Sequence, residues 1–223
     1  MKYEIDDIGN KVSYLDGKLH SYIDPETGLA LPAVIYPSGT MCWYKHGKPH
    51  RDDNDPITGL TLPAMFHSNG YKIWIKDGKS HRDDKDPITG LTLPAKIYPN
   101  GDSEWYKDNL LHRDDKDPET GLTLPAKIYV DGTRYWCKEG MRHRDNIDPE
   151  TGLTLPAIIM ANGCKYWFIN GMQHRDDGAN DTSLANNQLP AVIYPNGYAA
   201  WYINDIKIKE CMNYKPQVKS ARS

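Results

Sequence analysis

The chain has 223 residues and a formal net charge of −3, from 27 basic and 30 acidic side chains. This near balance argues against a dedicated binder of nucleic acid or of anionic membranes, because those partners select surfaces with an excess of Lys and Arg. No apolar stretch approaches transmembrane length, and residues 1–20 lack a signal-peptide pattern. We therefore expect a cytoplasmic protein.

A repeat of 31 residues organises the chain. A Pro-Ala pair recurs at steps of 31 residues and finally of 34, at Pro32, Pro63, Pro94, Pro125, Pro156 and Pro190. Eleven positions after each of these prolines stands one of the six tryptophans: Trp43, Trp74, Trp105, Trp136, Trp167 and Trp201. Each repeat needs to pack only on its neighbours, so a hydrophobic content of 39% is sufficient for such an array.

Residues 1–21 are predicted to be a half repeat that caps the array. Gly9, Gly17 and His20 reproduce the spacing of the later glycines and histidines, and Ser13 stands where the later repeats have Trp. An atypical end unit is typical of repeat arrays, because the terminal repeat has one face without a neighbour.

Each full repeat is predicted to form a β-hairpin. Leu91–Tyr98 alternates apolar and polar residues, which indicates a strand with one apolar face. A turn with Asn or Asp before Gly follows, where positive φ is tolerated, and Asp102–Lys107 forms the return strand. Pro94 cannot donate to a ladder, so we expect it at a bulge or at the first paired residue, with the hairpin core at about residues 95–107.

The fold class predicted for residues 22–210 is all-β, an elongated open antiparallel meander of six stacked hairpin repeats with about two strands each and no helix. The last repeat departs from the pattern, because residues 178–188 replace the usual loop and add three residues. Residues 211–223 are predicted to form a C-terminal cap and tail.

The four cysteines, Cys42, Cys137, Cys164 and Cys211, occupy different positions in their repeats and form no Cys-x-x-Cys pair. We interpret them as free thiols of a reducing compartment, which argues against a disulfide framework or a zinc site.

The segment Trp43–His50, together with the Asn-Gly turn, resembles the MORN repeat (membrane occupation and recognition nexus). The resemblance covers residues 3–210, and without the insert Asp86–Leu93 a repeat has a MORN-like length of 23 residues. His-Arg-Asp-Asp followed by Pro-Ala-x-Ile-Tyr-Pro-Asn-Gly resembles MORN-like proteins of giant DNA viruses. The resemblance implies a hairpin sheet that serves in protein interaction, dimerisation or lipid association, located in the infected-cell cytoplasm or the virion if the protein is viral.

A His-Arg-Asp-Asp box recurs five times, with Asp-Asn in its fourth copy. Stacked imidazoles and carboxylates could hold a row of metal ions. We favour a structural ladder, in which Arg and Asp of adjacent repeats pair and cap the turn, because one His per repeat does not supply the ligands of a zinc site. The residues are His50, His81, His112, His143 and His174, and Arg51, Arg82, Arg113, Arg144 and Arg175.

The Asp-Pro-x-Thr-Gly segment could be a calcium loop or a plain turn. We favour the turn, because the segment lacks the ligand count and the bidentate Glu of an EF-hand. These segments are also candidate interaction loops, at Asp55-Pro56, Asp86-Pro87, Asp117-Pro118 and Asp148-Pro149.

The Trp and Tyr rows could stack sugars or bases, but we favour a role in the core. Trp43 and its equivalents are expected on the Leu/Ala/Ile face, with Tyr36 and Tyr44 on the other. We expect the repeat loops to cover one face and a partner or a second copy to cover part of the other.

The function predicted from the sequence is a non-enzymatic scaffold for protein–protein interaction or dimerisation. The candidate acids, bases and histidines recur in register, whereas an active site is a single constellation, and no catalytic motif is present. The alternatives are a peripheral lipid-surface module and a metal- or carbohydrate-binding repeat. No cofactor and no nucleic-acid partner are expected, and membrane association is not expected.

Overall fold

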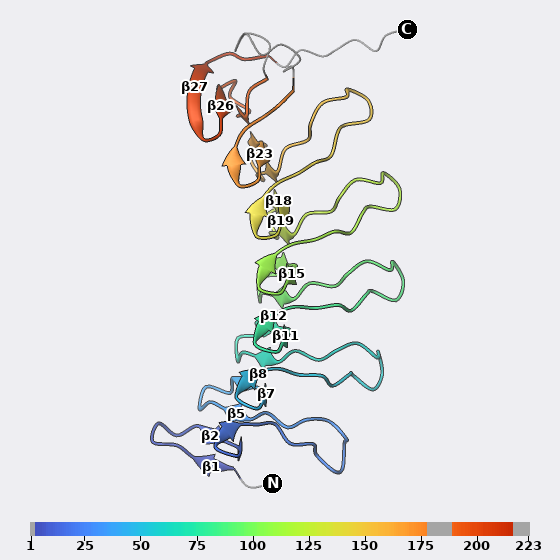
Figure 1. The fold of residues 1–223 in the computed structure, drawn as a ribbon, viewed down its shortest axis with the longest axis vertical. Coiled ribbons are helices and arrows are strands. Elements are labelled where there is room, and N and C mark those ends of the chain that lie inside the picture. Colours follow the sequence, from blue (N-terminus) through green and yellow to red (C-terminus); the bar gives the residue numbers. More distant parts are fainter. Residues whose placement is uncertain (1–2, 178–188, 216–223) are drawn as a thin grey trace. The chain divides into compact units, whose positions relative to one another are not determined.

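The computed structural model describes residues 3–177 and 189–215, so the predicted departure at 178–188 lies outside the described residues. Within these ranges every regular element is a β-strand and no helix occurs, so none is available to span a membrane. The strands pair antiparallel and in chain order, which confirms the all-β meander. The chain forms two compact parts, residues 1–110 and 111–223, here called the N-terminal half and the C-terminal half (Figure 1).

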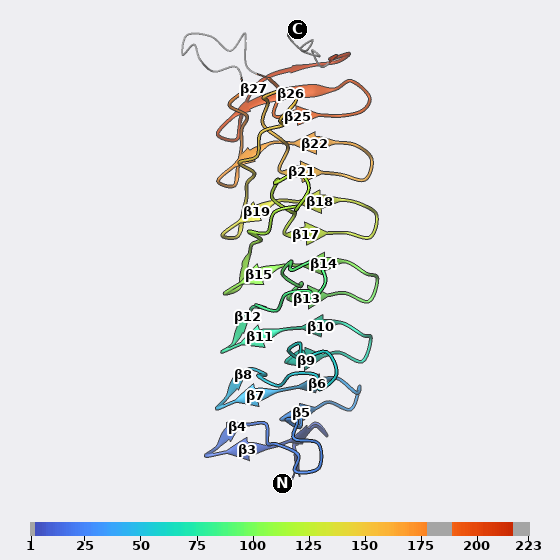
Figure 2. The same cartoon turned by 90° about the vertical axis from the view of Figure 1, so that its right-hand side faces the viewer.

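In the N-terminal half, eight described strands pair in chain order to form its main sheet. They are β1 (Glu4–Ile5), β2 (Lys11–Val12), β5 (Val34–Ile35), β6 (Met41–Cys42), β9 (Met65–Phe66), β10 (Lys72–Ile73), β13 (Lys96–Ile97) and β14 (Ser103–Glu104). Separate two-stranded hairpins lie beside this sheet (Figure 2): β3 (Tyr14–Leu15) with β4 (Lys18–Leu19), β7 (Tyr44–Lys45) with β8 (Lys48–Pro49), and β11 (Ile75–Lys76) with β12 (Lys79–Ser80). The strands β15 (Tyr106–Lys107) and β16 (Leu110–Leu111) lie where the two halves meet in the sequence.

The C-terminal half repeats this plan with seven described main-sheet strands. They are β17 (Lys127–Ile128), β18 (Arg134–Tyr135), β21 (Ile158–Ile159), β22 (Lys165–Tyr166), β25 (Val192–Ile193), β26 (Ala199–Ile203) and β27 (Ile206–Cys211). Its separate hairpins are β19 (Cys137–Lys138) with β20 (Met141–Arg142), and β23 (Phe168–Ile169) with β24 (Met172–Gln173).

The strands are shorter and more numerous than predicted. Of Leu91–Tyr98 only Lys96–Ile97 is a strand, because Pro94 interrupts the ladder as expected of a residue without an N–H. The predicted return strand 102–107 is split at Trp105 into β14 and β15. A complete repeat therefore has four short strands, two in the main sheet and two in a separate hairpin, and the prediction of about two was wrong.

The two turns of each repeat differ in conformation. In the main-sheet turn only Gly70 has positive φ, 91°, and the Asn69 side chain accepts a hydrogen bond from the Tyr71 N–H at 3.0 Å. In the separate hairpin both Asp77 and Gly78 have positive φ, 51° and 83°, which is the type I′ geometry that matches strand twist. Positive φ before Gly was thus predicted for the wrong turn, since Asn69 serves there as a side-chain acceptor.

Both ends of the array have their own contacts. Ser13, at the Trp position, is buried and donates from its hydroxyl to the His20 carbonyl at 2.7 Å. The Tyr3 hydroxyl donates to the Pro32 carbonyl at 2.8 Å. At the other end β27 finishes at Cys211, and Tyr214 packs edge-on against Trp201 with ring centroids 5.7 Å apart. These contacts fit the predicted caps, although the tail beyond residue 215 lies outside the described ranges.

The core is a row of small and aromatic residues. The Ala of each Pro-Ala pair is fully buried, and the tryptophans are 6–8% exposed. Trp43 faces Leu60 and Leu62 of a long loop, whereas Tyr44 packs with Val34 on the opposite face. This division of the faces agrees with the prediction.

The cysteines are free thiols, and Cys42, Cys137 and Cys164 are buried in the sheet. Burial raises the pKa of the Cys42 thiol to about 11, so this side chain is an inert packing residue at neutral pH.

Candidate functional site

In every described His-Arg-Asp-Asp box the Arg side chain donates from Nη1 to the carbonyl of the next Pro-Ala proline. Arg51 Cζ lies 4.0 Å from the ring centroid of Trp43, its Nε donates to Asp53 at 2.9 Å and its Nη1 donates to the Pro63 carbonyl at 3.3 Å. The same stacking occurs for Arg82 on Trp74 at 3.9 Å, Arg144 on Trp136 at 3.9 Å and Arg175 on Trp167 at 4.0 Å, and Arg113 pairs with Asp115 at 2.8 Å. Arg and Asp of one box therefore pair with each other, and the predicted pairing between adjacent repeats was wrong, because residues i and i+2 of an extended chain point to the same side.

The fourth box shows the cost of this burial. Asn146 stands where the other boxes have Asp, and Arg144 Nε donates to its amide oxygen at 3.3 Å. Burial without a carboxylate partner lowers the pKa of Arg144 to about 10. The guanidinium remains charged at neutral pH, so the stack tolerates a neutral partner.

The tryptophans hold the long loops, which are the segments containing Asp-Pro-x-Thr-Gly. Trp43 Nε1 donates to the Ala30 carbonyl at 2.7 Å, thirteen residues earlier in the chain. The same bond joins Trp74 to Thr61, Trp105 to Thr92, Trp136 to Thr123 and Trp167 to Thr154, at 2.7–2.9 Å. With one ring face against Arg and the N–H occupied, these buried tryptophans are core residues and are not a stacking platform.

The last residue of each box ties the preceding long loop in place. Asp53 accepts the Ala30 N–H at 2.8 Å, while Asp84 accepts the N–H of Thr61 at 3.1 Å and also its hydroxyl. In the C-terminal half Asn146 accepts from Thr123 and Asp177 accepts from Thr154 in the same way. One carboxylate or amide thus connects the Arg–Trp stack with the loop of the repeat before it.

The box histidines cap the next turn, a role that the sequence analysis assigned to Arg and Asp. His50 Nδ1 accepts the Asp77 N–H at 2.9 Å, and its Nε2 lies 2.6 Å from Asp52, off the axis of a hydrogen bond. Since Nδ1 accepts, the neutral ring carries its proton on Nε2. Lys45 also pairs with Asp52, at 2.9 Å.

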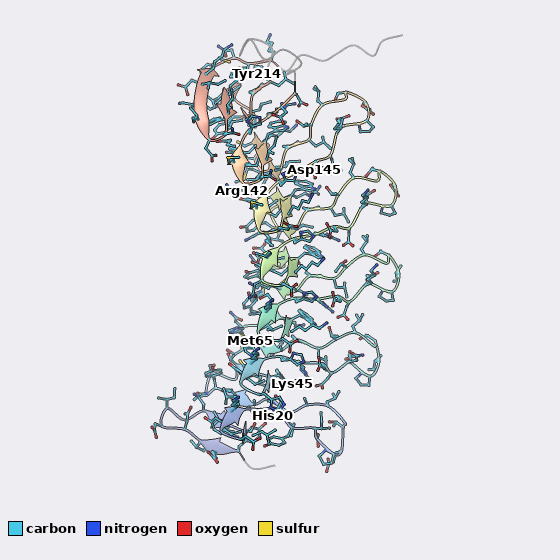
Figure 3. The ribbon with its side chains drawn as sticks, in the orientation of Figure 1. His20, Lys45, Met65, Arg142, Asp145 and Tyr214 are labelled. Atoms are coloured by element: carbon cyan, nitrogen blue, oxygen red, sulfur yellow. The ribbon has the colours of Figure 1, made fainter. Side chains whose placement is uncertain are left out.

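This arrangement recurs in the C-terminal half. His143 accepts from the Asn170 N–H at 3.0 Å and contacts Asp145, a residue labelled in Figure 3, which also pairs with Lys138 at 3.4 Å. The histidines and first aspartates of the boxes are therefore structural groups.

Each long loop is closed by its own aspartate. Asp55 Oδ1 accepts from the Ile57 N–H, the Thr58 N–H and the Thr58 hydroxyl at 2.8–3.1 Å, and the Gly59 N–H donates to the Asp55 carbonyl at 2.8 Å. Hydrogen bonds from the loop amides lower the pKa of Asp55, as they do for Asp86 and Asp117. The geometry is that of the predicted turn, and the described residues contain no group of three or more metal-ligating side chains.

The loop tips project into solvent beside the sheet (Figure 1), and Ile57 and Ile88 at two of them are 92% exposed. The other described tips carry Glu at this position, namely Glu26, Glu119 and Glu150. Of the predicted interaction-loop residues, Asp55, Asp86, Asp117 and Asp148 lie inside their turns, so the tip residues are the ones accessible to a partner.

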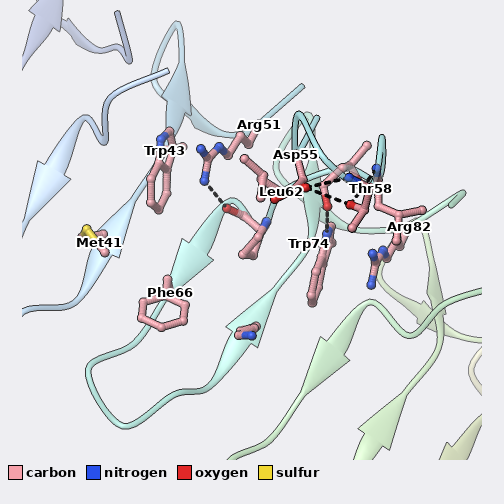
Figure 4. Close-up of a pocket in the computed structure, with 13 residues that line it drawn as sticks. Met41, Trp43, Arg51, Asp55, Thr58, Leu62, Phe66, Trp74 and Arg82 are labelled. Carbon is pink, nitrogen blue, oxygen red and sulfur yellow. Dashed lines mark hydrogen bonds between the residues drawn. The ribbon is translucent and has the colours of Figure 1, made fainter. Parts of the chain in front are cut away.

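A groove that the sequence did not indicate lies between a long loop and the main sheet of the N-terminal half (Figure 4). It has a volume of about 430 Å³ and runs from Trp43 to Trp74, with Phe66 and Lys72 on the sheet side and Leu62 on the loop side. The C-terminal half has a groove of about 410 Å³ with Trp167, Lys165 and Ile193. Lys two positions before Trp is the one signal in the sequence that both grooves share.

No protein-family model matches the chain, and no curated protein shows significant similarity to it.

Proposed function

We propose that this chain is a non-enzymatic repeat scaffold that binds a protein partner through the tips of its long loops. The observation that carries the proposal is the recurrence of one contact set. The His, Arg and Asp side chains that could do chemistry are engaged with each other, with Trp or with backbone groups in repeat after repeat. The loop tip is an exposed position that differs between the described repeats, with Ile in two of them and Glu in three.

The exposed tips have the properties of an interaction surface. Ile57 and Ile88 occupy the same position in consecutive repeats of one half, and both loops are held by the same indole bond. Two exposed Ile side chains on ordered loops favour a partner that itself has repeated binding sites, because after the first contact the second forms at a high effective concentration. A loop ordered before binding also loses little conformational entropy on binding.

The MORN-type assignment is part of this proposal. Consecutive β-hairpins are compatible with it, and the sequence resemblance supports it. In this proposal the chain works in the cytoplasm, or in the infected-cell cytoplasm or virion if it is a giant-virus protein, and a second copy of the chain is one form that the partner can take.

The test is affinity capture from the source cells with the whole chain as bait, followed by binding of the purified partner. The variant Ile57→Asp/Ile88→Asp changes only exposed atoms, so it should keep the wild-type melting temperature and lose at least tenfold in partner recovery. Ile8→Asp is the matched control, because Ile8 is 77% exposed on a main-sheet turn of the same half. Equal recovery by all three proteins would contradict binding through the tips.

Two further measurements address the alternatives. Sedimentation velocity over a hundredfold range of concentration shows whether the partner is a second copy. A monomer at every concentration would contradict self-association. Co-sedimentation with anionic vesicles tests the lipid-surface alternative, and binding to them that survives the Ile57→Asp/Ile88→Asp change would contradict the proposal.

A further inference from the structure

The two grooves, one in each half, each have a Lys, a Trp and an Arg in their lining. In the N-terminal half these are Lys72, Trp74 and Arg82, and three repeats later they are Lys165, Trp167 and Arg175. Volumes of about 430 and 410 Å³ lie in the usual range of ligand pockets. Lys72 lies across its groove from Trp43, whereas Lys165 lies beside Ile193, so the grooves share residue types and differ in the rest of their lining.

The walls of the groove are mostly apolar. In the N-terminal half Met41 and Phe66 come from the main sheet, and Leu60 and Leu62 come from the long loop (Figure 4). Trp74 cannot move away to close the space, because its indole N–H is bonded to Thr61 of that loop. The groove is therefore held open and suits an aliphatic or aromatic side chain.

In the groove of the N-terminal half, one of the lining cations has no carboxylate partner among the described residues. Arg82 is paired with Asp84 at 2.8 Å, and Arg51 is paired with Asp53. The carboxylate of Asp55 is satisfied by its own loop. The remaining charge is the Lys72 ammonium, which lies 5.9 Å from the ring centroid of Phe66 in a cation–π approach.

The groove of the C-terminal half likewise has one lysine without a carboxylate partner among the described residues. Arg175 there is paired with Asp177 at 2.6 Å. In the parts of the chain that the structure describes, neither Lys165 nor Lys72 has an anionic partner. An apolar groove with a single unpaired ammonium is complementary to an apolar side chain next to a carboxylate.

We propose that each groove binds an extended peptide segment of the partner protein, with an apolar side chain between sheet and loop and a neighbouring Asp or Glu on Lys72 or Lys165. This inference rests on the proposed function in taking the partner to be a protein. One uncompensated cation in each groove does not support nucleic acid, whose affinity comes from many phosphate contacts. The buried tryptophans leave no free ring face for a sugar.

The test begins with selection of a displayed library of random 12-residue peptides on the whole chain. The expected consensus is a large apolar residue beside Asp or Glu. A fluorescein-labelled consensus peptide is then titrated against the wild type and against Lys72→Met/Lys165→Met, which keeps the apolar stem of each lysine. We expect the dissociation constant to rise at least tenfold in the double variant. Added salt should raise the dissociation constant less in the double variant than in the wild type, because salt screens the attraction between Lys and a carboxylate.

Lys79→Met is the control, because Lys79 is an exposed lysine of the same half outside the groove. It should bind the peptide as the wild type does. If the Lys72→Met/Lys165→Met protein has a lowered melting temperature, Phe66→Leu is the second variant. It keeps the groove apolar but reduces the area in contact with the peptide. It should weaken binding and leave the preference for acidic peptides intact. Selection without acidic residues, or equal affinity of the wild type and the double variant, would overturn the inference.

The outcomes separate this inference from the proposed function. In one outcome the partner is lost with Ile57→Asp/Ile88→Asp and retained by Lys72→Met/Lys165→Met. This result supports binding through the loop tips and contradicts binding in the groove. Loss of the partner in the Lys72→Met/Lys165→Met variant alone supports binding in the groove and contradicts binding through the loop tips.

Discussion

His50 connects two consecutive repeats by accepting, at Nδ1, the backbone N–H of Asp77, 27 residues further along the chain. Asp77 begins the tight turn of the next separate hairpin, where its φ is 51°. A box histidine thus holds the following turn in the left-handed conformation that the hairpin needs. The same bond from His112, His143 and His174 makes the imidazoles a series of links between repeats.

Asp52 gives a prediction about stability in acid. Burial acts to raise its pKa, but the adjacent His50 imidazole and the hydrogen bond from Lys45 outweigh burial, and the pKa lies below the usual value of about 3.9. A depressed pKa in the folded state means that the contribution to stability is present at neutral pH and disappears as the pH falls through the folded value. In Asp52→Asn the melting temperature should therefore decrease less than in the wild type as the pH falls below about pH 4. The effect is small because the Asp52 side chain is 60% exposed.

The Arg–Asp pairs can be tested with the fourth box as a natural reference. Arg82→Met leaves the 14% exposed Asp84 without its cation, and we expect a loss of about 3–5 kcal/mol in the free energy of unfolding. Asp84→Asn should cost about 1 kcal/mol or less, because Asn146 fills the same position beside Arg144. The double variant Arg82→Met/Asp84→Asn should recover part of the loss. Denaturant unfolding followed by Trp fluorescence gives the coupling energy, and strict additivity would contradict a direct pair.

The period in the sequence located the repeats, but it did not reveal how each repeat bends. The spacing of Pro94 and Trp105 marked the hairpin correctly, since Pro interrupts a ladder by its own chemistry. The break at Trp105 was missed, because it comes from the long loop folding back to the indole, a contact between residues thirteen positions apart. The groove at Lys72 was missed for the same reason, since it exists only where that loop passes over the sheet.

The indole bond to the loop gives the last prediction. In Trp74→Phe the ring still packs against Arg82, but the Thr61 carbonyl loses its donor. An unsatisfied buried carbonyl costs about 1–3 kcal/mol, and the smaller ring adds to this by leaving space in the core. We expect a loss of stability of this order and faster hydrogen exchange at the amides of the Asp55–Leu60 turn.

The equivalent change Trp167→Phe is the internal control, because its indole donates to Thr154 at 2.9 Å in the other half. Each variant should loosen its own loop and leave the other loop as in the wild type. Hydrogen exchange that rises equally in both loops, or in neither, would show that packing of the ring and not the N–H holds the loop. The Ile57 tip would then owe its position to Asp84 and the loop's own turn, and Asp84→Ala, which removes the acceptor for the Thr61 N–H, should loosen it more than Trp74→Phe does.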